Sequence, residues 1–207
     1  VIPPNKQMSM EGNVLQLTEK EKSHQAVIDV FMRSMAKECE KLSIGIILSG
    51  TGSDGTLGLK AVKEFGGVTM VQDPEEAKYD GMPQSAIRTD LVDFILPVKE
   101  LAKKVMNHRE ILGKVKLPLQ DEKLSPEERS ALQDLFSLLA SNKGHDFKHY
   151  KRSSVLRRLQ RRMYITAKKS IQDYYAYVEE HPDEITELFK DLLICVTNFF
   201  RDPEAFA

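Results

Sequence analysis

The chain has 207 residues, 41% of them hydrophobic, so it is long enough for one large or two small globular domains and too apolar for a disordered polypeptide. Thirty Lys and Arg residues face 31 Asp and Glu residues, and the net charge of -1 argues against binding nucleic acid or an anionic membrane through overall charge. No apolar run approaches the ~18 residues of a membrane helix. The two cysteines, Cys39 and Cys195, lack metal-binding spacing. Composition therefore predicts a cytoplasmic protein without membrane insertion or a metal site.

The first half of the chain alternates strands and helices. It opens with VIPPN, which reads as a strand running into a turn, followed by a strand at 13–18 and an amphipathic helix at 25–40. An apolar strand at 44–48, a helix at 57–65 and a strand at 68–71 then follow at the pitch of a parallel sheet. A helical turn at 85–89, a strand at 92–96 and a helix at 98–112 complete the predicted α/β unit.

The second half is predicted to be helical after a polar linker at 113–123. Ser125, Pro126 and Glu128 are typical of a helix start, because the serine and glutamate side chains accept from free backbone amides. Further helices are predicted at 153–164, from residue 170, and around an apolar stripe at 185–193. Tyr174 and Tyr175 share a stripe with apolar neighbours and are predicted to lie in the core.

Three glycines, Gly50, Gly52 and Gly55, punctuate the loop GTGSDG between the apolar strand and its helix. This spacing satisfies the dinucleotide fingerprint, and Asp73 ends the next strand where a ribose-binding acid would lie. Asp54 lies inside the loop, however, and its carboxylate would compete with a pyrophosphate for the amide donors of the helix start. The same donors and the helix dipole favour an acid that stays ionised. Spacing alone leaves a turn former, a catalytic acid and a nucleotide loop open.

The segment IGIILSGTGSDGTLGLKAVKEFGG, followed by VQDP and GMPQSAI, resembles the C-terminal half of the catalytic domain of CheB, the chemotaxis receptor methylesterase. The helix SHQAVIDVFMRSMA resembles that family's RPS-x-D helix, with Asp29 at the matching acid. The resemblance covers about residues 1–105 and implies part of a doubly wound parallel sheet. It also implies that Asp54 is the acid of a Ser-His-Asp triad, which holds the imidazole in the correct tautomer and stabilises the imidazolium.

The serine and histidine of such a triad are expected upstream of this chain. No G-x-S-x-G turn occurs in the sequence, and Gln7 stands where many family members have histidine. All of the histidines lie outside the expected context: His24, His108, His145, His149 and His181. The sequence therefore predicts that the chain alone cannot complete an esterase cycle.

A basic stretch precedes an acidic one in the second half. Residues 143–169 hold ten bases and one acid, and the residues from 171 onward hold nine acids and two bases. The helix predicted at 153–164 places apolar residues on one arc and four arginines on the other: Arg157, Arg158, Arg161 and Arg162. This arc is compatible with a solvated face, a nucleic-acid surface, or a surface for an acidic protein, to which the bidentate guanidinium is suited.

GHDFKHYKRSSVLRRLQRRM, together with LLICVTNFFRDPEAF, resembles the N-terminal helical domain of CheR, the S-adenosylmethionine-dependent methyltransferase that esterifies receptor glutamates. The resemblance covers about residues 124–207 and implies that the arginine helix faces the glutamate-bearing helices of the receptor. It also implies that Thr197 and Arg201 line the S-adenosylmethionine site, where the arginine would pair with the cofactor's carboxylate. Many relatives have asparagine where this chain has Cys195.

These resemblances predict an internal piece of a CheB–CheR fusion, with an α/β part followed by an all-α part. A partial CheB-type methylesterase domain is expected at 1–112, a linker at 113–123, and a CheR-type helical domain at 124–207 that stops before the methyltransferase core. The full-length parent would remove and install methyl esters on the same chemoreceptor glutamates, whereas the fragment would be inactive. Its partners would be the cytoplasmic helices of methyl-accepting chemoreceptors and also a sensor kinase or response regulator. The alternatives are a catalytically dead adaptor and a dinucleotide-binding oxidoreductase.

Overall fold

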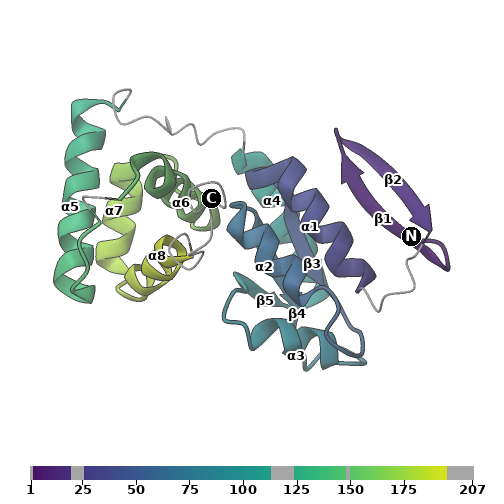
Figure 1. Ribbon diagram of the computed structural model, residues 1–207. Coiled ribbons are helices and arrows are strands. Elements are labelled where there is room, and N and C mark those ends of the chain that lie inside the picture. Colours follow the sequence, from purple (N-terminus) through teal and green to yellow (C-terminus); the bar gives the residue numbers. More distant parts are fainter. Residues whose placement is uncertain (1, 20–25, 113–123, 148–149, 195–207) are drawn as a thin grey trace. The chain divides into compact units, whose positions relative to one another are not determined.

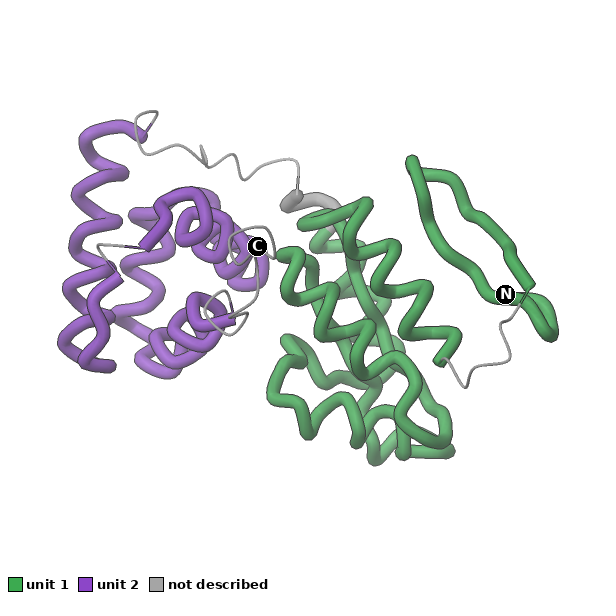
Figure 2. The backbone as a smooth tube through the Cα atoms, viewed as in Figure 1, with its two compact units in different colours: residues 1–110 green, residues 111–207 purple. Residues whose placement is uncertain are grey.

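The protein folds as two compact units, Val1–Glu110 and Ile111–Ala207, which Figure 2 distinguishes by colour. The computed structural model describes residues 2–19, 26–112, 124–147 and 150–194, with the backbone alone for 109–112. No helix within these ranges combines the length and the apolar character needed to cross a membrane.

Unit 1 is built on a three-stranded parallel sheet in the order β3 (Ile44–Ile47), β4 (Val68–Gln72), β5 (Phe94–Leu96). All five residues of β4 are buried, as expected for the central strand of a parallel sheet with helices on its faces. The chain between these strands forms α2 (Thr56–Glu64) and α3 (Gly81–Ile87), and α4 (Val98–Leu112) follows β5; Figure 1 shows the helices around the sheet. The predicted parallel α/β unit is therefore confirmed.

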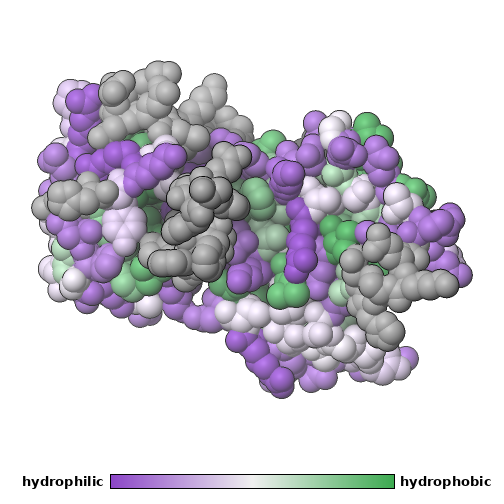
Figure 3. Space-filling view, viewed as in Figure 1, coloured by the Kyte–Doolittle hydropathy of each residue, from purple (hydrophilic) through white to green (hydrophobic). Residues whose placement is uncertain are grey.

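A β-hairpin and a long helix precede the sheet. β1 (Lys6–Glu11) pairs antiparallel with β2 (Val14–Glu19) across a tight turn at Gly12 and Asn13, both of which have positive φ. The hairpin is fastened to α1 (Val27–Cys39) by the Met10 amide, which donates to Ser34 Oγ at 2.9 Å, and the Gly12 amide, which donates to Glu38 Oε2 at 2.9 Å. Val14, Leu15 and Leu17 of the hairpin are exposed. Figure 3 shows hydrophobic surface in the region of the molecule where Figure 1 places the hairpin.

Two short elements differ from expectation. Residues 4 and 5 form the predicted turn, but the strand follows that turn as β1 instead of preceding it. α3 begins at Gly81, four residues before the predicted helical turn at 85–89, and Pro83 lies inside its first turn. Proline is tolerated there because the first amides of a helix have no acceptor within the helix.

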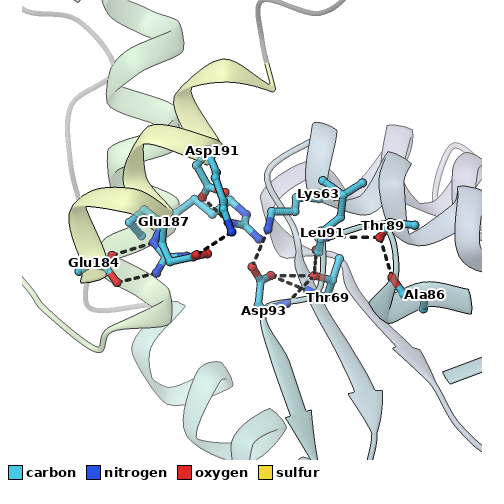
Figure 4. A network of polar contacts seen from close by, with 12 residues as sticks. Lys63, Thr69, Ala86, Thr89, Leu91, Asp93, Glu184, Glu187 and Asp191 are labelled. Carbon is cyan, nitrogen blue, oxygen red and sulfur yellow. Dashed lines mark hydrogen bonds and ion pairs between the residues drawn. The ribbon is translucent and has the colours of Figure 1, made fainter. Parts of the chain in front are cut away.

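Polar side chains tie α2 to the sheet. Lys63 Nζ lies 3.2 Å from Asp93 Oδ1, and Asp93 Oδ2 accepts from both the amide and the hydroxyl of Thr69, each at 2.9 Å. Figure 4 shows these residues converging at the start of β4. These contacts hold Asp93, which directly precedes β5, against Thr69 of β4.

Unit 2 consists of four described helices: α5 (Pro126–Lys143), α6 (Arg152–Ile165), α7 (Ile171–Glu180) and α8 (Asp183–Leu193). The predicted capping box is confirmed, because Ser125 Oγ accepts from the Glu128 amide and Glu128 Oε2 accepts from the Ser125 amide. α5 ends at Gly144, whose φ of 67° suits a helix terminus. The core of the unit gathers apolar residues from all four helices, including Leu135, Leu159, Tyr174 and Leu188.

Candidate functional site

Asp54 lies in the loop that connects β3 to α2, at the carboxyl edge of the parallel sheet. The described hydrogen bonds of its side chain go to α1 and not to α2, the helix that follows it. Oδ1 accepts from the Asp29 amide at 2.9 Å, and Oδ2 accepts from the Ile28 amide at 3.1 Å. Both amides belong to the first turn of α1, whose N-cap residue, Ala26, has no side-chain oxygen. Asp54 therefore supplies from a distant loop the cap that α1 lacks locally.

The expected donors for Asp54 were the amides of α2, and the structure corrects this. Gly58, in the first turn of α2, donates its amide to Asp29 Oδ1 at 2.7 Å. Asp54, which precedes α2, thus caps the start of α1, and Asp29, in the first turn of α1, caps the start of α2. Asp54 is therefore an acid held by the amides of a helix start, as expected, but the helix is α1 and not α2. The missing cap at Ala26 is the sequence signal that pointed to an acceptor elsewhere.

Gly50 and Gly55 allow close packing within unit 1, whereas Gly52 has open space around it. A Cβ at Gly50 would lie 2.3 Å from Met82 Sδ, and one at Gly81 would lie 3.1 Å from the Gly52 nitrogen. The amides of Thr56 and Gly58 at the start of α2 are already bonded, to Ser53 O and to Asp29. A pyrophosphate would need such amides. These contacts argue against the nucleotide-loop interpretation.

Asp73, the proposed ribose-binding acid of that interpretation, accepts from the Glu75 amide at 3.0 Å in a local turn. This is the usual role of an aspartate that ends a strand. The geometry therefore gives Asp73 a structural function of its own.

The carboxylate of Asp54 retains capacity for one further partner. Its residue is partly exposed, and each carboxylate oxygen has a second lone pair beyond the amide bond it accepts. An imidazole N–H approaching from the exposed side can use such a lone pair. In unit 1, His108 lies on α4, and His24 lies outside the described residues. Within the described residues, the partners of the Asp54 carboxylate are the amides of Ile28 and Asp29, and His108 is not among them.

The four arginines of α6 do not form a uniform solvated face. Arg162 donates to Glu184 through two parallel bonds, from Nε at 2.8 Å and from Nη2 at 2.6 Å. Arg161 pairs with Asp191, also on α8. Figure 4 labels Glu184 and Asp191, the two α8 acids of these pairs. The alternative of a solvated face does not describe Arg158, Arg161 and Arg162, which are buried, and Arg157 is half-buried.

Arg162, Tyr174 and Glu184 form one buried cluster inside unit 2. The Tyr174 hydroxyl donates to Glu184 Oε1 at 2.7 Å, the same oxygen that accepts from Arg162 Nε. Burial alone would lower the pKa of Arg162, but its bonds to Glu184 and the charges of Glu184 and Asp191 outweigh burial and raise it. Arg162 therefore remains charged, and the cluster joins α6, α7 and α8. The predicted burial of Tyr174 is confirmed.

Tyr174→Phe should change how the stability of unit 2 depends on pH. Burial, followed by the charge of Glu184, raises the pKa of Tyr174 well above its ordinary value of 10.0. The folded protein holds the phenol proton more tightly than the unfolded chain, so this contribution is complete below pH 10.0 and is lost as the pH rises toward the folded pKa. We expect the variant to lose about 1 kcal/mol at neutral pH and to show a shallower alkaline decline. Denaturation at a series of pH values measures both, and parallel alkaline curves would contradict this assignment.

Two predicted cofactor contacts, Thr197 and Arg201, lie outside the described residues, as does Cys195. The structure therefore leaves their role as a prediction. The described residues therefore contain two separate candidate sites, the Asp54 loop within unit 1 and the arginine helix within unit 2.

Unit 1 is a parallel α/β domain that carries an anchored acid at the carboxyl edge of its sheet, and unit 2 is a helical bundle. The family model of the CheB methylesterase matches residues 1–105, and that of the all-alpha domain of the CheR methyltransferase matches residues 130–193. The chain belongs to the CheB methylesterase family. Its CheB part is followed by a CheR-type helical domain, as a fragment of a CheB–CheR fusion would be.

The chain is similar to several individual proteins. An uncharacterised 104.1 kDa protein of Rhodobacter capsulatus is 33% identical over the whole chain, which spans 24% of that relative. A putative protein-glutamate methylesterase/protein-glutamine glutaminase of Leptospira interrogans is 37% identical over 49% of the chain and 54% of its own length. The crystal structure of the Thermotoga maritima CheB methylesterase catalytic domain is 28% identical, with a TM-score of 0.45, over 49% of this chain and 57% of that one. The chain thus spans between a quarter and a little over half of these relatives.

Proposed function

We propose that the longer polypeptide containing this chain is a bifunctional enzyme of chemotaxis adaptation. It hydrolyses glutamate methyl esters on the cytoplasmic helices of chemoreceptors and re-forms them with S-adenosylmethionine. The order of a CheB part and a CheR part supports this proposal. The observation that carries it is the position of Asp54, partly exposed at the carboxyl edge of the sheet and oriented by two amides.

In the esterase reaction, Asp54 is proposed to accept the Nδ1–H of a histidine supplied by the preceding part of the polypeptide. That imidazole takes the proton of a serine hydroxyl as its oxygen attacks the ester carbonyl, and then gives the proton to the departing methanol. A water molecule hydrolyses the resulting acyl-serine by the same steps. Asp54 fixes the tautomer and stabilises the imidazolium, and the amides of Ile28 and Asp29 fix Asp54.

For methyl transfer, unit 2 is proposed to recognise the receptor. The arginine helix α6 is the proposed contact for acidic receptor helices, since guanidinium groups bind carboxylates in a bidentate manner. The residues proposed for it are Arg157, Arg158, Arg161 and Arg162, of which Arg157 is the least buried. Arg161 and Arg162 also pair with acids of α8. Thr197 and Arg201 are the proposed residues for S-adenosylmethionine, which supplies the methyl group when bound.

The test is a pair of assays on the full-length polypeptide with receptor fragments as substrate. Methanol release from methyl-esterified glutamates measures the esterase, and transfer of a labelled methyl group from S-adenosylmethionine measures the reverse modification. Ammonia release from receptor glutamines is followed in parallel, because the Leptospira relative also carries glutaminase in its name. A polypeptide that binds receptor but releases no methanol and transfers no methyl group would instead be an adaptor. Binding of a nicotinamide cofactor that weakens on Gly52→Ala would favour the oxidoreductase.

A further inference from the structure

Asp29 contacts the loop of the proposed catalytic acid in two ways. Its backbone amide donates to Asp54 Oδ1 at 2.9 Å, and its side-chain Oδ1 accepts from the Gly58 amide at 2.7 Å. The residue is only 6% exposed, so both bonds are shielded from competing water. One residue of α1 therefore holds the chain on both sides of the segment 55–57.

That segment needs an external restraint. Gly55, next to Asp54, has a φ of 92°, a conformation open chiefly to glycine, and glycine is also the residue with the greatest freedom to leave it. On the other side, the loop is tied to the chain before α3, since the Gly50 amide donates to Tyr79 O and the Met82 amide donates to Gly50 O. Those bonds fix the start of the loop. The end that carries Asp54 is fixed through α1.

We propose that Asp29 is a positioning residue for the esterase reaction. It holds the start of α2, and through it the Asp54 carboxylate, in the orientation that an imidazole N–H requires. This inference rests on the proposed esterase function and adds to it a residue that does not touch the substrate. A misplacement of about 1 Å at such a group lowers a rate by about 100-fold.

The two acids differ in how many oxygens they use, and this difference allows a sharp test. Asp29 uses one carboxylate oxygen, so asparagine at 29 can still accept from Gly58 with its amide oxygen. Asp54 uses both oxygens, so asparagine at 54 would present its NH2 group to a backbone donor. Asp29→Asn should therefore preserve the loop. Asp29→Ala removes the acceptor, and Asp29→Glu keeps the charge but displaces it by one carbon–carbon bond.

The experiment measures kcat and KM for methanol release by the full-length polypeptide. We expect Asp29→Ala to lower kcat by about 100-fold with KM nearly unchanged, Asp29→Glu to lower it substantially, and Asp29→Asn to stay within about threefold of the unsubstituted protein. Glu38→Ala is the matched control, because Glu38 also lies on α1 and accepts one backbone amide, from Gly12 of the hairpin. It should leave kcat unchanged. Hydrogen exchange should speed up in peptides covering 50–58 for Asp29→Ala and not for Glu38→Ala.

Each outcome bears on the inference. Full activity of Asp29→Ala, with Asp54→Asn inactive, overturns the role of Asp29 and leaves the esterase function intact. Equal losses in Asp29→Asn and Asp29→Ala, with both proteins folded, also overturn it, since charge and not placement would then matter. Should Asp29→Ala fail to fold, the comparison of Asp29→Asn with Asp29→Glu still decides between charge and position. Unchanged hydrolysis by Asp54→Asn overturns the proposed triad and this inference with it.

Discussion

Asp54→Asn in the full-length polypeptide is expected to lower kcat for ester hydrolysis by about 10³- to 10⁴-fold, the loss typical of a triad whose acid can no longer hold the correct imidazole tautomer. Methyl transfer should keep its rate, because the residues proposed for it lie in the other unit. The two activities are measured on the same preparation, so the second serves as an internal control for protein concentration and for the folding of unit 2. Equal esterase rates for the variant and the unsubstituted protein would reject the triad assignment.

The same substitution should also weaken the fold of unit 1. Both carboxylate oxygens of Asp54 accept amides of α1, and asparagine can satisfy only one of them. A donor left without an acceptor costs about 1–3 kcal/mol. Asp73→Asn is the matched control, because Asp73 also follows a strand of the sheet but accepts a single local amide, from Glu75. It should change neither hydrolysis nor the melting of unit 1 appreciably.

Glu184→Ala should destabilise unit 2 by about 3–5 kcal/mol, because removing one partner of a buried ion pair leaves the other charge uncompensated. The substitution removes the acceptor of Arg162 Nε and Nη2 and of the Tyr174 hydroxyl at once. Replacing both Arg162 and Glu184 with apolar residues of similar volume should recover part of this loss, since a buried pair adds little over a well-packed apolar contact.

Glu187→Ala is the control for Glu184→Ala. Glu187 lies on the same helix but makes an exposed pair with Lys190, which is worth at most about 1 kcal/mol. Native-state hydrogen exchange of peptides from α6, α7 and α8 measures the difference in the intact chain. A loss of about 3 kcal/mol corresponds to exchange about a hundredfold faster or more. Similar exchange in the two variants would contradict the importance of the Arg162–Glu184 pair.

The elements that sequence analysis predicted well are those with strong local signals. β3 and β4 are continuous apolar runs, and α5 begins at a serine whose capping box is visible in four consecutive residues. β1 was missed although Met8 and Met10 alternate with polar residues. The strand was instead assigned to VIPPN, the segment immediately before it. α3 was placed too late, since it begins at Gly81 and holds Pro83 in its first turn, a position that a helix accepts.

The candidate site was predictable in its residues but not in its contacts. The motif GTGSDG identified Asp54. The amides that hold its carboxylate, however, belong to Asp29 and Ile28, which lie 25 and 26 positions earlier in the chain. A pattern read along the sequence assigns an acid to the nearest helix start, which here is α2. The arginines of α6 were likewise separated from their acids by 22 to 30 positions. The ten bases followed by nine acids were the one visible hint that positive and negative side chains neutralise each other inside the bundle.

The hydrogen bonds between Asp54 and α1 affect what the presence of this aspartate says about the activity of a homologue. A single side chain that fastens a helix is retained by selection for folding, even in lineages that have abandoned hydrolysis. We therefore expect homologues that have lost their nucleophile to keep this aspartate. Genome surveys that score esterase competence by its presence would then overcount, and the serine-bearing turn is the better marker.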